Sequence, residues 1–293
     1  MKVGLYSPYL KTMGGGERYF LTVAQYFLLK GDKVNIFSDP IDLKSIKTRF
    51  ALDLTGVNFV PNIFESSLVN KLIKSANYDL IFVLSDGSIP ITLAKRTILH
   101  FQTPFNDKRT VNSWTKFKIR FVKNIICNSA FTKKSIDATY RVDSLVVYPP
   151  VDVDMFKAGE KTNTILSVGR FFAPSHPKKQ AEMITAFSRL ITSGLKGWNL
   201  VLLGGVTGES QSQVDGLRDS IKGLPIEIIT DVNFSVLQER YSTAKIYWHA
   251  AGFGENLLDS PEKAEHFGIT TVEAMAAGCV PIVVNRGGHK EII

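Results

Sequence analysis

The chain has 293 residues, more than one typical domain, and 44% of them are hydrophobic, enough for two buried cores. No run reaches the roughly 18 uncharged apolar residues of a membrane-crossing helix, the start lacks a signal-peptide pattern, and no segment has a disordered composition. The formal charge of +8 favours anionic partners such as nucleic acid, acidic lipids or phosphorylated substrates. Cys127 and Cys279 lie inside apolar runs, where buried thiols are expected. We expect a cytoplasmic protein, soluble or attached to a membrane surface.

Short apolar runs alternate with longer segments of helical period, a pattern typical of βαβ units around a parallel sheet. Two prolines, Pro149 and Pro150, separate two such series, because they force extended backbone. We therefore predict two α/β domains, residues 1–150 and 151–293. The first series of predicted strands is 3–6, 34–37, 57–60, 80–84, 97–101, 124–127 and 144–147. The second series is 164–168, 200–203, 227–229, 246–249 and 280–284.

Three consecutive glycines, residues 14–16, follow the first predicted strand and precede a helix expected from Tyr19 to Lys30 and closed by Gly31. Without Cβ atoms, the backbone N–H groups at such a helix start can approach a phosphate or a sugar closely. The spacing differs from G-x-G-x-x-G, and although Asp39 is nearby no acid is firmly placed for a ribose, so a dehydrogenase is only weakly indicated. A tight turn that needs glycine only for packing is the alternative interpretation.

A basic loop follows the first strand of the second series. Arg170 comes directly after the strand end at Gly169, and Lys178 and Lys179 stand at the predicted start of the next helix. A guanidinium fork and an ammonium group together can hold both phosphates of a diphosphate at the carboxyl edge of a parallel sheet. A solvated basic loop is the alternative.

Two carboxylates eight residues apart stand near the end of the chain. Glu265 is expected in a loop, and Glu273 in the first turns of a helix that ends at Gly278. The backbone N–H groups of Gly268 and Ile269 lie between them at the helix N-terminus. Because carboxylates accept hydrogen bonds from sugar hydroxyls and free N–H groups bind phosphate, we predict one pocket that binds sugar, phosphate and ribose.

Several motifs occur in a common order: the glycine-rich turn, N-S-x-x-T and Y-P-P-V-D in the middle, V-G-R…K, and E-x7-E around FGITTVEAMAAG. With them the chain resembles glycosyltransferase family 4, a retaining family of GT-B fold, over essentially its whole length. The resemblance implies two Rossmann-like parallel-sheet domains facing a central cleft. It also implies a nucleotide-diphosphate sugar, GDP- or UDP-linked, as donor, with no metal and no other cofactor required.

The resemblance assigns donor-binding roles to side chains of the second domain. Glu273 would bind the donor ribose, and Glu265 would contact hydroxyls of the donor sugar near the reacting carbon. Arg170 and Lys178 would neutralise the diphosphate, with Lys179 as the alternative to Lys178.

Other roles implied by the resemblance fall mainly on the backbone. Gly15 and Gly16 would close over the donor from the first domain, and His100, at a strand end, would lie near the donor sugar and the reaction centre. Three residues would wrap the phosphates with their backbone: Phe267, Gly268 and Ile269.

Two patterns that imitate metal sites are interpreted as structural. The D-x-D formed by Asp152 and Asp154 follows the two prolines in the predicted linker, whereas metal-binding D-x-D motifs end a strand inside a sheet. His249, His266 and His289 lack regular ligand spacing, so we expect core or surface histidines rather than zinc ligands.

A basic segment at residues 108–123 is expected to form a helix. Arg109, Lys116, Arg120 and Lys123 would lie near one face of it. Such a helix suits an acidic membrane or a phosphorylated lipid acceptor, and a solvated face is the alternative.

These observations predict a retaining hexosyltransferase that moves a mannose- or glucose-type hexose to a glycan or lipid-linked acceptor, in surface polysaccharide or glycoconjugate biosynthesis. Peripheral contact with an anionic membrane is expected, and a nucleic-acid partner is not. The alternatives are a nucleotide-sugar-binding subunit or an inactive truncated form without turnover, and an epimerase or phosphorylase of the same fold. Relatives of this fold continue beyond the GGHKEII segment, so we expect the second domain to be incomplete.

Overall fold

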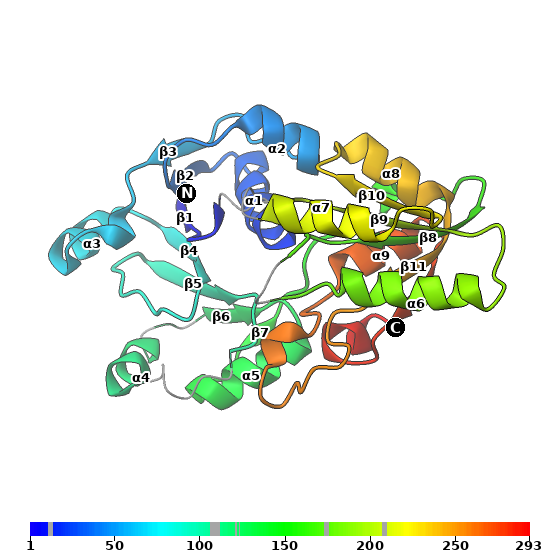
Figure 1. Ribbon diagram of the computed structural model, residues 1–293. Helices are drawn as coiled ribbons and strands as arrows, with labels where there is room; N and C mark the ends of the chain where they lie inside the picture. The colour runs from blue at the N-terminus through cyan, green and yellow to red at the C-terminus, as the bar shows by residue number, and fades with distance from the viewer. Residues whose placement is uncertain (11–13, 106–111, 121, 123, 173–175, 207–209) are drawn as a thin grey trace. The chain divides into compact units, whose positions relative to one another are not determined.

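The computed structural model describes residues 1–10, 14–105, 112–120, 122, 124–172, 176–206 and 210–293. The chain divides into two compact units, Met1–Pro150 and Val151–Ile293. Each unit contains one sheet whose paired strands are all parallel, with helices packed against it (Figure 1). The predicted α/β class is therefore confirmed for both units.

The first unit contains a seven-stranded sheet of order β3-β2-β1-β4-β5-β6-β7. Because β1 lies between β2 and β4, the strand order reverses beside β1, which is the place where doubly wound folds bind ligands. The strands are β1 (Lys2–Tyr6), β2 (Lys33–Phe37), β3 (Asn58–Val60), β4 (Leu80–Ser85), β5 (Arg96–Phe101), β6 (Asn124–Cys127) and β7 (Leu145–Val146). The helices are α1 (Gly15–Leu29), α2 (Leu43–Phe50), η2 (Ile63–Glu65), α3 (Leu68–Ser75), α4 (Ser113–Ile119) and α5 (Ala130–Tyr140).

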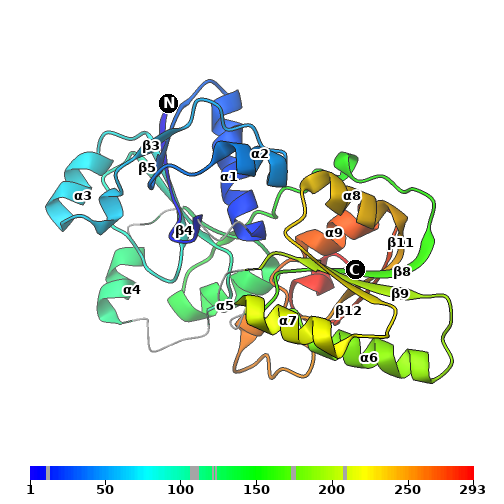
Figure 2. The ribbon, with the colours of Figure 1, turned by 45° about the horizontal axis from the view of Figure 1, so that its top comes forward.

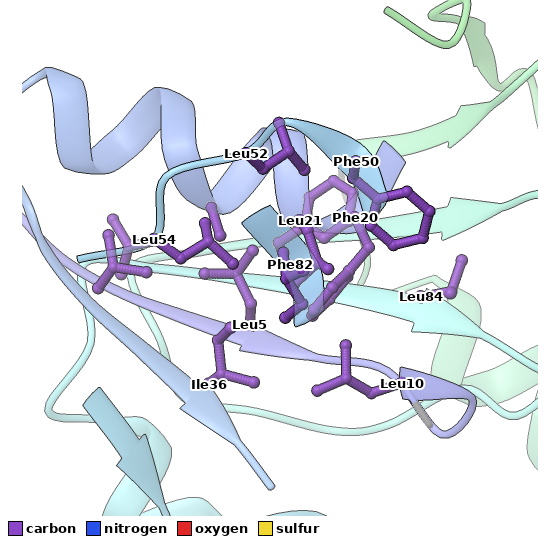
Figure 3. Close-up of a cluster of buried hydrophobic side chains, with 14 of the residues drawn as sticks. Leu5, Leu10, Phe20, Leu21, Ile36, Phe50, Leu52, Leu54, Phe82 and Leu84 are labelled. Carbon is purple, nitrogen blue, oxygen red and sulfur yellow. The ribbon is translucent and has the colours of Figure 1, made fainter. Parts of the chain in front are cut away.

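Both faces of this first sheet are buried. Every residue of β4 is buried, and successive side chains point to opposite faces of the sheet. Phe82 packs with Leu5 and Phe20 in one core cluster (Figure 3), while Val83 belongs to a second cluster. Continuous apolar strands are what a parallel sheet covered on both sides requires.

Helix α1 begins earlier than the sequence predicted, at Gly15 rather than Tyr19. Gly14 is the N-cap, and its backbone N–H donates to the Glu17 carboxylate over 2.7 Å. A carboxylate in the first helical turn also interacts favourably with the positive end of the helix dipole, so two of the glycines become helical. The helix ends at Leu29, and Gly31 follows with a left-handed φ of +75°.

Helix α4 is shorter than the basic helix expected over residues 108–123. It starts at Ser113 because the Asn112 side chain caps it, accepting a hydrogen bond from the Thr115 N–H at 2.8 Å. Arg109 and Lys123, two of the four residues assigned to its basic face, lie outside the described residues.

The second unit contains a five-stranded sheet of order β10-β9-β8-β11-β12. The chain passes from β8 outward through β9 and β10 and then returns to β11 on the other side of β8 (Figure 1). The strands are β8 (Thr162–Val168), β9 (Asn199–Gly204), β10 (Ile226–Thr230), β11 (Ala244–His249) and β12 (Val280–Val283). The helices are η3 (Val153–Met155), α6 (Gln180–Thr192), α7 (Gln211–Ser220), α8 (Phe234–Thr243), η5 (Pro261–Lys263), α9 (Ile269–Ala276) and η6 (Gly287–Glu291).

Within the described residues, no helix is both long and apolar enough to span a bilayer.

Candidate functional site

The candidate site lies in the second unit, at the carboxyl ends of the neighbouring strands β8 and β11. Gly169 and Arg170 follow β8, and His249 is the last residue of β11. Glu265 follows the short helix η5 and precedes α9. This is the topological switch point of the sheet, where open α/β folds place their ligands.

Two glycines allow the loop after β8 to pack tightly against β9. A Cβ atom on Gly204 would lie 1.9 Å from the carbonyl oxygen of Gly169, so only glycine fits there. A Cβ atom on Gly169 would lie 2.8 Å from Cγ of Lys178. The stem of Lys178 therefore lies directly over the end of β8, and its ammonium group is carried toward Glu265.

The Glu265 carboxylate is the centre of the site. Its Oε2 atom lies 2.6 Å from Nζ of Lys178, 2.8 Å from Nε2 of His249 and 3.6 Å from Nε2 of His176. The side chains of Lys178 and Glu265 are only 16% and 10% exposed, so this is a largely buried ion pair. The structure thus brings together Glu265 and Lys178, which the sequence assigned to sugar and diphosphate respectively.

Burial alone would raise the pKa of Glu265, but the opposing charge of Lys178 and the nearby imidazoles outweigh it and hold that pKa well below its ordinary value. Burial, with the adjacent charge of Lys178, holds the pKa of His176 well below its usual range. Burial also lowers the pKa of His249, although Glu265 acts in the opposite direction. These shifts favour an ionised carboxylate at Glu265 and neutral imidazoles at His176 and His249.

Four of the chain's five histidines gather around Glu265, which the sequence analysis did not predict. The rings of His176 and His266 stack with centroids 4.3 Å apart, and His249 packs edge-on against His289 at 4.7 Å. These residues come from two loops, the end of β11 and the short helix η6, and no spacing in the sequence connects them. Among the described residues, no three His, Cys, Asp or Glu side chains are grouped so that they could hold a metal ion.

The structure distinguishes the two consecutive lysines. Lys179 caps α6 with a left-handed φ of 62°, and its ammonium group lies 2.7 Å from Glu255 and 3.3 Å from Glu182. Glu255 also pairs with Lys263. Lys178, rather than Lys179, therefore meets Glu265.

The N-terminus of α9 follows the loop that contains Glu265 and Phe267. Gly268 is its N-cap with φ of +111°, a conformation that glycine adopts without strain. The N–H groups of Gly268 and Ile269 form no hydrogen bond with any described residue. Free N–H groups at a helix start suit a phosphate, and Phe267 is buried beneath them.

Glu273 lies in the second turn of α9 and is almost completely buried. Its Oε2 atom accepts a hydrogen bond from the Tyr241 hydroxyl at 3.1 Å. Burial, and to a lesser extent the charges of Glu265 and Glu273, raise the pKa of the Tyr247 phenol, whose hydroxyl donates to Oγ1 of Thr270 at 2.7 Å. The ribose role implied for Glu273 stays a prediction.

Arg170 is half-buried, and its guanidinium forms no ion pair with a described residue. Its backbone oxygen accepts a hydrogen bond from Gln180 at 3.0 Å, which fixes the loop. A cation without a carboxylate partner at this edge of the sheet suits an anionic ligand.

Gly16 and His100, two of the residues of the first unit that the sequence analysis placed near the donor, are also explained by how they pack within that unit. A Cβ atom on Gly16 would lie 2.3 Å from the Gln102 side chain, which donates a hydrogen bond to the Gly16 carbonyl, whereas Gly15 is exposed. His100 is fully buried in β5 and packs on Tyr19, and neither ring nitrogen has a hydrogen-bond partner among the described residues. Burial lowers the pKa of His100 to about 3.

Comparison with known protein families identifies both units. Residues 13–155 match the family model described as "Glycosyltransferase Family 4", and residues 152–293 match the model "Glycosyl transferases group 1". The chain belongs to glycosyltransferase family 4. The resemblance inferred from the motifs is thereby confirmed.

Named relatives of this family 4 chain transfer sugars. It is 30% identical over 179 residues to a GDP-Man:Man(3)GlcNAc(2)-PP-Dol alpha-1,2-mannosyltransferase of Xenopus tropicalis, a match that covers 57% of this chain and 34% of the relative. It is 26% identical to a D-inositol 3-phosphate glycosyltransferase of Mycobacterium marinum, over 56% of this chain and 35% of the relative. The chain spans about a third of the length of these relatives.

Solved structures confirm the GT-B fold. WaaG, a glycosyltransferase involved in lipopolysaccharide biosynthesis, has a TM-score of 0.63 at 14% identity, covering 99% of this chain and 83% of that chain. An alpha-glucosyltransferase in complex with UDP and DNA has a TM-score of 0.61 at 14% identity, covering 97% and 79%. At such identities the likeness concerns the fold alone.

Proposed function

We propose that this family 4 chain transfers a hexose from a nucleotide-diphosphate sugar to a glycan or lipid-linked acceptor, with retention of configuration. The observation that carries the proposal is the group at the switch point of the second sheet. It consists of the buried Lys178–Glu265 pair, the Arg170 guanidinium and the N–H groups that begin α9, and among the described residues neither the guanidinium nor these N–H groups have a protein partner. Cations and N–H groups suit a diphosphate, and a fixed carboxylate suits sugar hydroxyls.

The proposed mechanism follows from where charge develops. As the bond between the sugar and the diphosphate breaks, the leaving group becomes more negative and the sugar gains positive, oxocarbenium-like character. Arg170, Lys178 and the N–H groups of Gly268 and Ile269 would stabilise the leaving diphosphate, and the N–H groups need no reorganisation because the start of α9 fixes their direction. Glu265 would orient the sugar through its hydroxyls. The proposal includes no metal and no cofactor other than the donor.

The donor and acceptor belong to the same proposal. Relatives named for GDP-mannose and dolichol-linked substrates favour a mannose- or glucose-type donor and a membrane-linked acceptor. A thermal-shift panel of GDP, UDP, GDP-mannose and UDP-glucose would identify the nucleotide, because only a ligand that binds the native state stabilises it. Product analysis with labelled donor then separates a transferase from a nucleotide-sugar-binding subunit, which would show a shift but no transfer.

Arg170→Ala is expected to weaken donor binding about 10- to 100-fold, because a hydrogen bond to a charged group contributes roughly 1.5–3 kcal/mol. Titration calorimetry with the nucleotide that gives the largest thermal shift measures the effect. Arg189→Ala, which removes an exposed arginine from α6, is the matched control and should bind as the original protein does. Equal affinity in both variants would contradict the diphosphate role.

We also propose peripheral contact with an anionic membrane through the surface formed by α3 and α4, which lie at the same end of the first unit in both ribbon views (Figures 1 and 2). Burial and the charge of Lys71 on α3 lower the pKa of Lys118 on α4, so the two helices are close. Neither helix contains an acidic residue. Large apolar side chains are exposed on both: Leu68, Val69, Ile73, Trp114 and Phe117.

Apolar and cationic side chains together suit an interfacial helix on anionic lipid. We expect the protein to co-sediment with phosphatidylglycerol-containing vesicles at low salt, and W114A/F117A to reduce the bound fraction several-fold. Binding should also fall with rising salt, because charge attraction is screened. L190A, at an exposed leucine on α6, is the control. If the protein did not sediment with anionic vesicles, the membrane contact would be contradicted. It would also be contradicted if L190A reduced the bound fraction as much as W114A/F117A.

A further inference from the structure

The Glu265 carboxylate is held asymmetrically. Its contacts with Lys178, His249 and His176 all involve Oε2. No described residue forms a hydrogen bond with Oε1. One oxygen is therefore engaged by the protein, and the other is left for a ligand.

The hydrogen-bond directions around Oε2 follow from elementary chemistry. Lys178 donates to Oε2 and lies 3.4 Å from Nε2 of His176, which must accept because an ammonium group only donates. His176 therefore offers no proton to Glu265 from that nitrogen. His249 must donate from Nε2, because an ionised carboxylate only accepts.

Neighbouring elements hold the His249 ring at the end of β11. The ring packs edge-on against His289, with an interplanar angle of 82°. Nε2 of His289 lies 3.0 Å from the Thr271 hydroxyl, which ties this pair of rings to α9. Nε2 of His249 lies 2.8 Å from Oε2, but neither ring nitrogen forms a hydrogen bond of regular geometry with a described residue, so this contact is short and bent. The ring therefore has one polar contact, and that contact is Glu265.

The backbone of Glu265 is fixed as well. The Gly288 N–H donates to the Glu265 carbonyl over 2.7 Å, and a Cβ atom on Gly287 would lie 2.4 Å from the same carbonyl oxygen. With the main chain fixed in this way, the remaining freedom of Glu265 is rotation of its side chain. Lys178 is a flexible point charge that can follow such a rotation, whereas a ring at the end of a strand cannot.

We propose that His249 is a positioning residue, which fixes the rotation of the Glu265 carboxylate so that Oε2 stays with the protein and Oε1 faces the donor sugar. This inference rests on the proposed function, because it specifies how Glu265 would be presented to the donor. Lys178 supplies the charge that neutralises the Glu265 carboxylate, and His249 fixes the direction in which that carboxylate points.

Activity of three variants tests the proposal, with GDP-mannose or UDP-glucose as the donor, whichever is turned over. H249L removes the N–H donor and should lower kcat about 10- to 100-fold with little change in donor KM, because a small misplacement of an orienting group costs that much. H249Q keeps an N–H donor and should recover most of the loss. W248F changes the preceding residue, whose side chain lies on the opposite face of β11, and should leave kcat unchanged. Equal losses in H249L and H249Q would overturn the proposal.

A titration of the carboxyl itself gives a readout that needs no turnover. The charged or titratable groups that face Glu265 are Lys178, His176, His289 and Tyr247, besides His249. Because a hydrogen bond to the ionised form lowers a carboxyl pKa, H249L should raise the pKa of Glu265, and H249Q should raise it less. Carbon-13 NMR of labelled glutamate, with E265Q to assign the signal, measures the shift.

The two experiments separate this inference from the proposed function. A raised pKa in H249L, with no sugar transfer by any form of the protein, would support the positioning contact and contradict the transferase assignment. An unchanged pKa in H249L would overturn the positioning role even if transfer is observed.

Discussion

E265Q is expected to lower kcat for sugar transfer by about 10²- to 10³-fold, the loss typical of removing one preorganised group that stabilises developing charge. The substitution keeps the size of the side chain and its ability to contact a hydroxyl, but it removes the negative charge beside the reacting sugar. Donor affinity should change less than kcat, because in the proposed site Arg170, Lys178 and the start of α9 would still bind the diphosphate. Steady-state kinetics with labelled donor measure both quantities. Near-normal turnover would contradict the role of Glu265.

The same variant has a predictable effect on stability. Loss of the carboxylate leaves Lys178 buried without its partner, which costs about 3–5 kcal/mol for a buried pair. E265Q/K178M, which removes both charges, should recover much of that loss in urea denaturation while staying inactive.

Since the pKa of Glu265 is lowered in the folded protein, the stabilisation by this pair is present above the ordinary glutamate pKa and is lost as pH falls through the lowered value. The free energy of unfolding of E265Q should therefore not contain this contribution and should not show its loss at low pH.

G204A is expected to lower the free energy of unfolding by about 3 kcal/mol and to weaken donor binding as well. A Cβ atom at this position would lie 1.9 Å from the Gly169 carbonyl oxygen, and backbone cannot move aside as a flexible side chain can. The loop that carries Arg170 and Lys178 would be pushed away from the end of β8. Urea denaturation and nucleotide titration of the same variant measure the two effects.

G216A is the matched control, because a Cβ atom there meets nothing within 4 Å and the residue lies inside α7. Alanine should raise the free energy of unfolding by roughly 0.5–1 kcal/mol, since glycine is a poor helix former. A stability change of the same sign and size in both variants would show that the close approach at Gly204 has no energetic importance.

Much of the architecture could be predicted from the sequence because parallel strands buried on both faces are continuous apolar runs. The strand at Leu80–Ser85 was predicted almost to its ends for this reason. Helix starts were predicted less well: α1 begins at Gly15 because Glu17 reaches back to the Gly14 N–H, and α4 begins at Ser113 because Asn112 caps it. Such local hydrogen bonds compete with glycine's poor helix propensity and with helical periodicity, and they decide where an element begins.

By itself, the sequence determined the family and the two parallel sheets, since motif order and apolar runs are properties of the chain, and it predicted the residue types of the candidate site. Only the tertiary structure decided that Lys178 and not Lys179 meets Glu265, because a left-handed turn at Lys179 sends consecutive side chains to different carboxylates. It also decided that His176 and His249 share that carboxylate. Residues so far apart in sequence meet only when strands β8 and β11 pair side by side, and no local pattern encodes that pairing.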